Sequence, residues 1–548
     1  MNVESLHLTL LWPLRMDCLA LPDGVAKCAR YVADSPSWSK CDPLQVSPNN
    51  PVELRHAELA YFHPFTRKLL FEGSTVLERR DVRAMRCLIA TKRGVLANSE
   101  LTLNVDCVQL RLFETGVAML TVELSRDEPL PLDVTQDLLD QVRRAYRPYW
   151  ELRRLGENKG VEPKESDSGH CPVHVSWMDE KGHPIGNEST YGHGEAKQRL
   201  LRVPVVQPAI SEHWRWLLAP LQGGVSGSGG WCYEQILDER IPAMAHLSFA
   251  NPRALTSGDF IRLALMDDSG SSATLPYAKE FLARFEQEHC YDRFWEVEPG
   301  SWMATRFMTA GYSFVMTGEK PPDSMKNEDW YPGFFMDDLS GGLAHFRHHY
   351  FQLGLLAHLQ EASLLVLLDQ MAAAAQCLRV EDPQDADVKK ARDLRRRMAL
   401  FAGRYWFTEV TNQVQGRELF DLWRRHLDSE KLFREAMEQI GLLDSVLADI
   451  EEKRAQDWRD EMEKILGLGA MIGLGLGFFG MSSFVGDLDQ AIDYASEQDG
   501  VGGFLAAAWE QIAWGEFLIV LIIGAALALY IQQVWKVVGK RKREKKDT

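Results

Sequence analysis

The sequence lacks most of the features that mark secreted proteins, zinc-cluster proteins and nucleotide hydrolases. Its nine cysteines include no Cys-x-x-Cys pair, which excludes a zinc ribbon and a thioredoxin-type redox motif. No basic segment followed by an apolar run stands at the N-terminus, so we expect no signal peptide. The glycine-rich stretch 223–230 is not followed by the Lys-Ser or Lys-Thr pair that a phosphate loop requires. We therefore expect a soluble part in a reducing cytoplasm, and no enzyme.

Positive charge is scarce over the chain as a whole. The 548 residues include 61 Lys and Arg against 78 Asp and Glu, which gives a formal net charge of −17. This balance excludes a general nucleic-acid-binding surface, so any basic patch has to be judged locally. The length is sufficient for two to four domains of about 100–200 residues each.

Charge is absent altogether from two long segments near the C-terminus. Residues 465–484 and residues 517–534 contain no charged side chain. A helix of about 20 such residues crosses a hydrocarbon core of about 30 Å. We predict a first membrane span at 465–484 and a second at 517–535, embedded in a lipid bilayer. The alternative is a buried hairpin inside a soluble protein.

Lysine and arginine are also missing between these segments, from residues 485–516, whereas both flanks are basic. Four Lys or Arg residues lie in 453–464, and seven lie in the tail 536–548. The positive-inside rule therefore predicts a membrane protein with both chain ends in the cytoplasm and 485–516 as an external loop. The acidic side chains of that loop would concentrate cations at a pore mouth, and the first of them are Asp487, Asp489 and Asp493.

The first predicted span is rich in glycine rather than leucine. Gly469, Gly473 and Gly477 repeat at every fourth position, and small residues at this spacing let helix backbones approach closely. Two helices cannot enclose a pore, so a channel requires a homo-oligomer, either a tetramer or a pentamer. The alternative is a hairpin that only tethers the soluble part.

Before the spans, residues 341–464 predict a long helical stalk. Apolar residues recur there at three- and four-residue spacing, and proline is absent after residue 383. Within this segment His345, His348 and His349 stand at helical spacing. They predict either a metal-binding face or, as the better-favoured alternative, histidines with ordinary packing partners.

The N-terminal 340 residues predict an α/β cytosolic region, so the fold class is α+β followed by helices. Residues 1–155 alternate as strands at 5–16 and 56–65, form a β-hairpin around Glu114-Thr115-Gly116, and continue as a helix from 132. Residues 156–340 predict an enlarged region and candidate sensor. It begins with a polar linker or inserted element at 156–194.

Long helices that lead into a C-terminal two-span hairpin, with Gly480-Met481 closing the first span and a basic tail, resemble the CorA-type metal-ion transporters. That family ends the pore-lining span with Gly-Met-Asn, whereas this chain has Gly480, Met481 and Ser482. The resemblance covers residues 340–548. It implies that the first span lines the pore and that a divalent cation such as Mg²⁺ is at the pore. The serine offers one hydroxyl where the family has an amide, so it leaves the permeant ion open.

The enlarged cytosolic region also resembles CorA-like effectors of bacterial anti-phage systems. This resemblance implies a channel gated by a nucleotide or single-stranded oligonucleotide that a partner nucleotidyltransferase makes. Basic residues interleaved with aromatic ones suit phosphate contacts and base stacking, although ordinary surface packing is the competing explanation. The candidate ligand-binding residues are Arg143, Arg144, Tyr146, Arg147, Tyr149, Trp150, Arg153, Arg154, Lys197, Arg199, Arg202, Trp214, Arg215 and Trp216.

Three functions are therefore open from the sequence. The first is a homo-oligomeric, ligand-gated cation channel that acts in anti-phage defence. The second is a divalent-cation transporter with an altered motif. The third is a membrane-tethered sensor or scaffold that conducts nothing.

Overall fold

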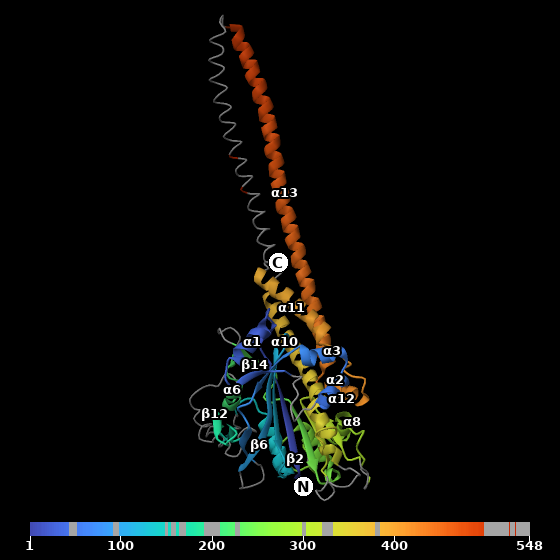
Figure 1. Cartoon of the computed structure of the whole chain (residues 1–548). Helices are drawn as coiled ribbons and strands as arrows, with labels where there is room; N and C mark the ends of the chain where they lie inside the picture. Colours follow the sequence, from blue (N-terminus) through green and yellow to red (C-terminus); the bar gives the residue numbers. More distant parts are fainter. Residues whose placement is uncertain are drawn as a thin grey trace. The chain divides into compact units, whose positions relative to one another are not determined.

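The computed structural model divides the chain into two units (Figure 1). Unit 1 comprises residues 1–372 and 394–440, and unit 2 comprises residues 373–393 and 441–548. The residues that the structure describes are 1–42, 52–90, 98–147, 152–154, 161–163, 171–190, 209–224, 231–273, 275–296, 298, 303–320, 333–378, 384–497, 525 and 532.

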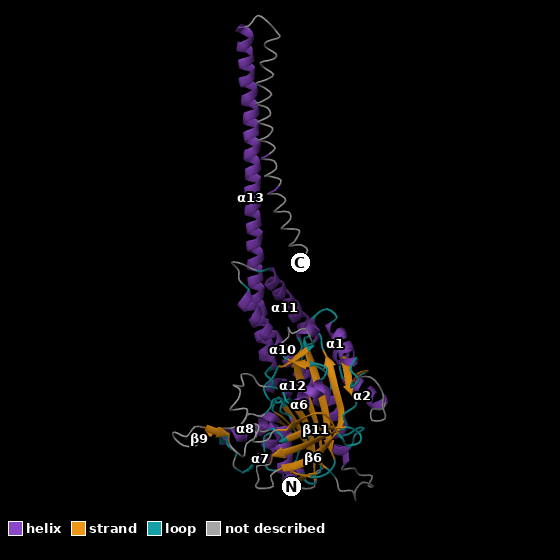
Figure 2. Ribbon diagram, turned by 90° about the vertical axis from the view of Figure 1, so that its left-hand side faces the viewer, coloured by secondary structure: helices purple, strands orange, loops and turns teal. Residues whose placement is uncertain are grey.

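One large mixed β-sheet organises unit 1 (Figure 2). Its neighbouring strands are antiparallel except for two parallel pairs, β15 with β18 and β13 with β14. Strands from both halves of the N-terminal region share this sheet, so residues 1–155 and 156–340 form one domain rather than two. In spatial order the strands are β12 (Pro184–Thr190), β11 (His174–Met178), β5 (Ala84–Ala90), β6 (Asn98–Leu112), β7 (Val117–Arg126), β2 (Ser5–Arg15), β15 (Ala243–Phe249), β18 (Ser313–Glu319), β17 (Arg306–Thr309) and β16 (Cys290–Tyr291).

Shorter strands extend this sheet or pair beside it. β4 pairs with the far end of β6 and carries β3, while β14 pairs with the end of β2 and carries β13. Two small pairs stand apart, β1 with β8 and β9 with β10. The bounds are β1 (Asn2–Val3), β3 (Trp38–Cys41), β4 (Thr75–Arg79), β8 (Leu130–Pro131), β9 (Leu152–Arg154), β10 (Val161–Pro163), β13 (Gln222–Gly223) and β14 (Cys232–Gln235).

One face of the sheet is apolar and forms the main core. Alternate residues of β2, from Leu6 to Leu14, are at most 1% exposed, as period-two alternation requires of a half-buried strand. Trp12 on this face contacts Trp214 edge to face, with ring centres 5.6 Å apart. Five helices contribute side chains to the same core: α1 (Gly24–Ala33), α4 (Leu132–Val142), α6 (Glu212–Leu218), α7 (Ser257–Leu265) and α8 (Lys279–His289).

The opposite face of the sheet is covered by a long segment that begins at Gly342. This segment consists of α9 (Gly342–His345), the π-helical turn η6 (Phe346–Tyr350) and α10 (Phe351–Cys377). Ser363 of α10 hydrogen-bonds Thr115 at the β6–β7 turn, with 3.0 Å between the oxygens. α12 (Val414–His426) packs beside it, and Trp423 stacks on Phe314 of β18 at 4.5 Å.

α10 was expected to belong to the stalk, but it is a core helix of unit 1. By length and composition, Gly342–Cys377 is the one helix among the described residues that is apolar enough to cross a membrane. Of its apolar window, 89% is buried inside the protein. A helix that is apolar on all sides is buried on all sides, and here the sheet and α12 bury it.

The remaining long helices are α11 (Asp385–Arg404) and α13 (Ser429–Glu497). α13 is continuous over 69 residues, which corresponds to about 100 Å at 1.5 Å per residue. Within unit 2, α11 and α13 are joined by ion pairs from Arg392 to Glu451 (2.8 Å) and from Arg454 to Asp385 (2.6 Å). After residue 383 the predicted helical stalk is therefore three helices, with turns between α11 and α12 and between α12 and α13.

Several predicted elements are confirmed and one is wrong. The strand at 5–16, the hairpin around Gly116 and the helix from 132 are present as β2, β6–β7 and α4. Residues 56–65 are not a strand, because they lie in α2 and the start of α3. Residues 156–194 are not only a linker, because β11 and β12 extend the sheet. The short helices are α2 (Val52–Tyr61), α3 (Pro64–Arg67), η1 (Asp17–Ala20), η2 (Lys68–Glu72), η3 (Pro252–Ala254) and η5 (Gly333–Met336).

Candidate functional site

The sheet face beneath η6 and α10 is polar, although it is covered. Register places His246 of β15, His7 of β2 and Ser125 of β7 in one row across the strands. All three side chains are at most 7% exposed. Buried polar side chains are costly unless they are paired, so this row needs partners from the segment above it. We call His7, Asp106, Ser125, His246 and Arg347 the polar layer. Its members His7, Ser125 and His246 are buried, whereas Asp106 and Arg347 lie at its more exposed edge.

A β-bulge in β6 adds a carboxylate to this layer. The register shifts between Val105 and Cys107, and the bulge redirects the intervening side chain. Asp106 consequently accepts a hydrogen bond from the Ser125 hydroxyl at 3.0 Å. Val105 and Val108 both remain in the apolar core on the other face.

Arg347 of η6 supplies the compensating positive charge. Its Nη2 lies 2.9 Å from Oδ2 of Asp106 and 3.1 Å from Nδ1 of His7. Burial raises the pKa of Asp106, and the Arg347 charge opposes that rise. The layer is therefore a hydrogen-bonded polar network between the sheet and its covering helix.

The two layer histidines are held in the neutral form. Nε2 of His246 hydrogen-bonds the Phe335 carbonyl at 3.0 Å, and the two rings stack at 3.9 Å. Burial lowers the pKa of His246 to about 3. Burial, with smaller contributions from His246 and Arg347, lowers the pKa of His7 to about 2.

A buried carboxylate on α2 also contacts the segment that covers the sheet. Glu58 has no exposed surface, accepts a hydrogen bond from Nε2 of Gln352 at 2.9 Å, and lies 3.6 Å from Nδ1 of His348. His348 is therefore turned toward Glu58, and only two of the three clustered histidines, His345 and His349, line open space.

That open space is a cavity of about 390 Å³, within the size range of small-ligand sites. Tyr61 and His349 are its closest aromatic pair, with ring centres 4.4 Å apart. Gln415 donates a 2.6 Å hydrogen bond from Nε2 to the Tyr350 hydroxyl. No lysine or arginine lines the cavity among the described residues, so its polar groups are imidazole, phenol and amide. It is lined by Ala57, Ala60, Tyr61, His345, His349, Tyr350, Gln413 and Gln415.

Acid should destabilise this domain because its buried histidines cannot accept protons while folded. The pKa values of His7 and His246, and that of His213 at about 3, lie below the ordinary 6.5. Between pH 6.5 and about 3 the unfolded chain binds more protons, so stability falls as pH falls, by up to about 1.4 kcal/mol per pH unit for each histidine. We expect the thermal midpoint of the full-length protein to drop steeply below pH 6.5.

One substitution isolates a single contribution to that acid sensitivity. His246→Gln removes one titrating group, so the thermal midpoint should depend less on pH between 6.5 and 4.5 than in the wild type. The exposed His183 is the matched control, and His183→Gln should leave the slope unchanged. An unaltered slope in His246→Gln would show that this histidine is not the acid-sensitive group.

The predicted basic–aromatic ligand surface is not formed by its central residues. Arg143 and Arg144 are each 3% exposed and Trp214 is 0% exposed. Arg144 is ion-paired with Asp140 at 2.6 Å and also with Glu239. The prediction of ligand stacking and phosphate contact is therefore wrong for these three residues, because they are internal parts of the fold.

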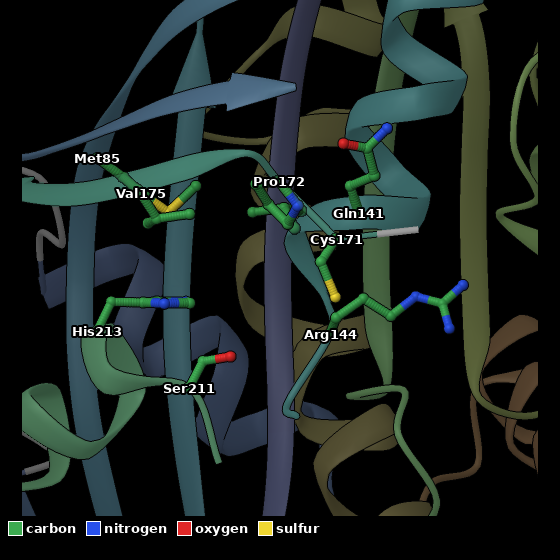
Figure 3. A pocket seen from close by; sticks show the side chains of 9 residues that line it. Met85, Gln141, Arg144, Cys171, Pro172, Val175, Ser211 and His213 are labelled. Carbon is green, nitrogen blue, oxygen red and sulfur yellow. The ribbon is translucent and has the colours of Figure 1, made fainter. Parts of the chain in front are cut away.

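Figure 3 shows the surroundings of Arg144, whose side chain extends away from His213. The side chains around Cys171, including Gln141, Arg144 and His213, enclose a pocket with no room for a water molecule. This closed packing leaves no entry for a ligand.

The other predicted ligand residues have varied placements. Arg147 and Arg215 both pair with Glu212, and the Arg79 guanidinium lies 3.8 Å from the Trp216 ring centre. Tyr146 is half-buried and pairs with Ile210 in a β-bridge. Arg153 and Arg154 lie in β9. Tyr149, Trp150, Lys197, Arg199 and Arg202 lie outside the described residues.

The predicted pore residues lie on α13. Gly469, Gly473, Gly477, Gly480, Met481 and Ser482 are all within this helix. The helix continues through Asp487, Asp489 and Asp493 to Glu497, so the predicted acidic mouth begins as helix and not as irregular loop. The second predicted span, apart from Ala525 and Gln532, lies outside the described residues, and both spans stay predictions.

Comparison with known proteins leaves the family of this chain open. No family model matches the chain, and no curated protein matches it. A solved structure, that of the full-length CmaX protein, is similar over 55% of this chain and 90% of its own length, with 13% sequence identity and a TM-score of 0.16. A likeness at this TM-score assigns no fold and no function to this chain.

Proposed function

We propose that this chain is the subunit of a homo-oligomeric cation channel in a bacterial inner membrane, controlled by a ligand of its soluble region. The observation that carries the proposal is α13, one helix that begins beside the folded sheet domain and continues into the uncharged glycine-rich segment. A continuous helix is a rigid element through which a movement of the domain can reach the segment.

The side chains of α13 support a membrane environment. Leu466, Leu468, Met471 and Leu474 are between 41% and 76% exposed. Contiguous apolar side chains of this size are unfavourable in water and mark a protein or membrane contact. Arg459 and Lys464, directly before this segment, are exposed and fit the cytoplasmic end of a span.

The glycines of α13 support a contact between copies. A Cβ added at Gly467, Gly473 or Gly477 meets no atom of the described residues within 4 Å. The described part of the chain therefore does not require glycine at these positions. Close helix approach in an oligomer, or a narrow pore wall, would require it.

The gating signal in this proposal is a nucleotide or oligonucleotide, and the cellular role is anti-phage defence. Both rest on the resemblance to defence effectors. Since the central Arg and Trp residues of the predicted surface are buried, the ligand contacts have to lie elsewhere in the soluble region.

Ion flux through reconstituted vesicles tests the proposal. Purified full-length protein in liposomes should pass cations, and nucleotides or short oligonucleotides should change the rate. Protein-free vesicles are the control. Magnesium uptake that no added nucleotide changes would favour a transporter, and protein that is inserted but passes no cation would favour a tethered sensor; either result overturns the proposal.

A further inference from the structure

The cavity beside α2 contains two histidines from one short segment. His345 ends α9 and His349 lies in η6, and both line the cavity with Tyr61. π-Helical turns occur frequently at functional sites. The turn brings the two imidazoles together while His348 points to Glu58.

The tautomer of His345 is fixed by its own helix terminus. Nδ1 of His345 lies 2.6 Å from the carbonyl oxygen of Gly341. A carbonyl only accepts, so Nδ1 carries the proton and donates. Nε2 of His345 therefore keeps its lone pair.

His349 has the complementary arrangement. Its Nδ1 is buried and has no hydrogen-bond partner among the described residues. In the tautomer that carries its proton on Nε2, the Nδ1 lone pair is left over. The side chain is 6% exposed, so an unused buried acceptor here is costly unless something binds it.

Histidines that bind metal ions show this same arrangement. One ring nitrogen donates to a carbonyl or carboxylate, which orients the ring, and the other nitrogen binds the metal. The spacing agrees as well. Two imidazoles on one tetrahedral zinc ion, with Zn–N bonds of about 2.0–2.1 Å, have ring centres about 5 Å apart. The ring centres of His345 and His349 are 5.0 Å apart.

We propose that His345 and His349 bind a transition metal ion of the zinc type, with Nε2 of His345 and Nδ1 of His349 as its protein ligands. Among the described residues no group of three or more His, Cys, Asp or Glu side chains has metal-binding geometry. The remaining coordination positions therefore belong to water or to a small ligand in the cavity, as in zinc sites that keep an open position. The Asp337 carboxylate interacts electrostatically with His345 and favours a cation there.

This inference does not rest on the proposed channel. It concerns the soluble region alone, and a protein that conducts nothing could still bind zinc at this cavity. The metal type also differs from the Mg²⁺ that the CorA resemblance implies at the pore, because imidazole nitrogen selects zinc, nickel or copper over magnesium.

Zinc titration of the full-length protein in detergent tests the proposal. The wild type should bind zinc, and His345→Gln and His349→Gln should each weaken binding by about tenfold or more. His348→Gln is the matched control, since it changes the adjacent histidine that faces Glu58, and it should bind zinc as the wild type does. Equal affinity in all four proteins would overturn the proposal.

A spectroscopic measurement covers the case in which a variant fails to fold. X-ray absorption at the zinc edge of the wild type should show two imidazole nitrogens at about 2.0–2.1 Å. A zinc environment without imidazole scattering contradicts the assignment irrespective of the variants.

Discussion

Gly473→Leu is expected to reduce cation flux to the level of protein-free vesicles while leaving the soluble domain folded. A Cβ at this position meets no atom of the described residues within 4 Å, and leucine favours a helix over glycine by roughly 0.5–1 kcal/mol. Nothing in the described part of one chain therefore predicts harm. In an oligomer the added side chain would occupy either the helix–helix contact or the pore itself. Flux of dye-loaded vesicles measures the effect.

Gly441→Leu is the matched control for this prediction. Gly441 lies on the same helix, and a Cβ there also meets no atom within 4 Å. It lies before the uncharged segment, so its substitution should leave flux unchanged. Wild-type flux in Gly473→Leu would remove the first span from the pore wall.

Arg144→Ala is expected to destabilise the soluble domain by about 3–5 kcal/mol. The Arg144 and Asp140 side chains are 2% and 1% exposed and lie 2.6 Å apart. Removing one member of a buried ion pair is strongly destabilising, because the remaining charge stays buried after this interaction is lost. A lower midpoint of chemical or thermal unfolding of the full-length protein measures the loss.

Arg215→Ala is the matched control for the buried pair. Arg215 pairs with Glu212 at 3.2 Å, but its side chain is 52% exposed, and exposed pairs contribute about 0–1 kcal/mol. The unfolding midpoint should therefore stay near that of the wild type. Unchanged stability in Arg144→Ala, with a lost response to nucleotide, would restore the ligand-binding role that the sequence suggested.

Local patterns predicted the elements whose partners lie nearby in the chain. The β6–β7 hairpin surrounds Gly116, whose φ of +89° suits the turn, and both flanking strands alternate clearly. The end of α2 was mistaken for a strand because residues 56–65 alternate in character along the sequence. The contacts that hold this helix, from Glu58 to Gln352 and His348, are distant in the chain. A local sequence pattern cannot predict a contact between residues that are nearly 300 positions apart in the chain.

The position of α10 against the sheet also could not be predicted from the sequence pattern. Its apolar residues surround the helix, so they indicate burial without identifying what buries it. We assigned α10 to the stalk because it precedes α11–α13 in the sequence. The contacts of Ser363 on α10 and Trp423 on α12 show instead that these two helices pack against the sheet.

The candidate site was also predicted only in part. The helical spacing of His345, His348 and His349 identified these three residues. It could not show that His348 contacts Glu58, or that Tyr61, Gln413 and Gln415 complete the cavity. Within the basic–aromatic run, the prediction failed at Arg143 and Arg144 for the opposite reason, because these arginines satisfy internal carboxylates and carbonyls such as those of Asp140 and Tyr312.

Recording from a planar bilayer tests the central claim most directly. With full-length protein in the membrane and unequal salt on the two sides, we predict discrete current steps whose reversal potential shows cation selectivity. Protein that is demonstrably inserted but gives no current above the lipid background, with or without nucleotides, would contradict the channel.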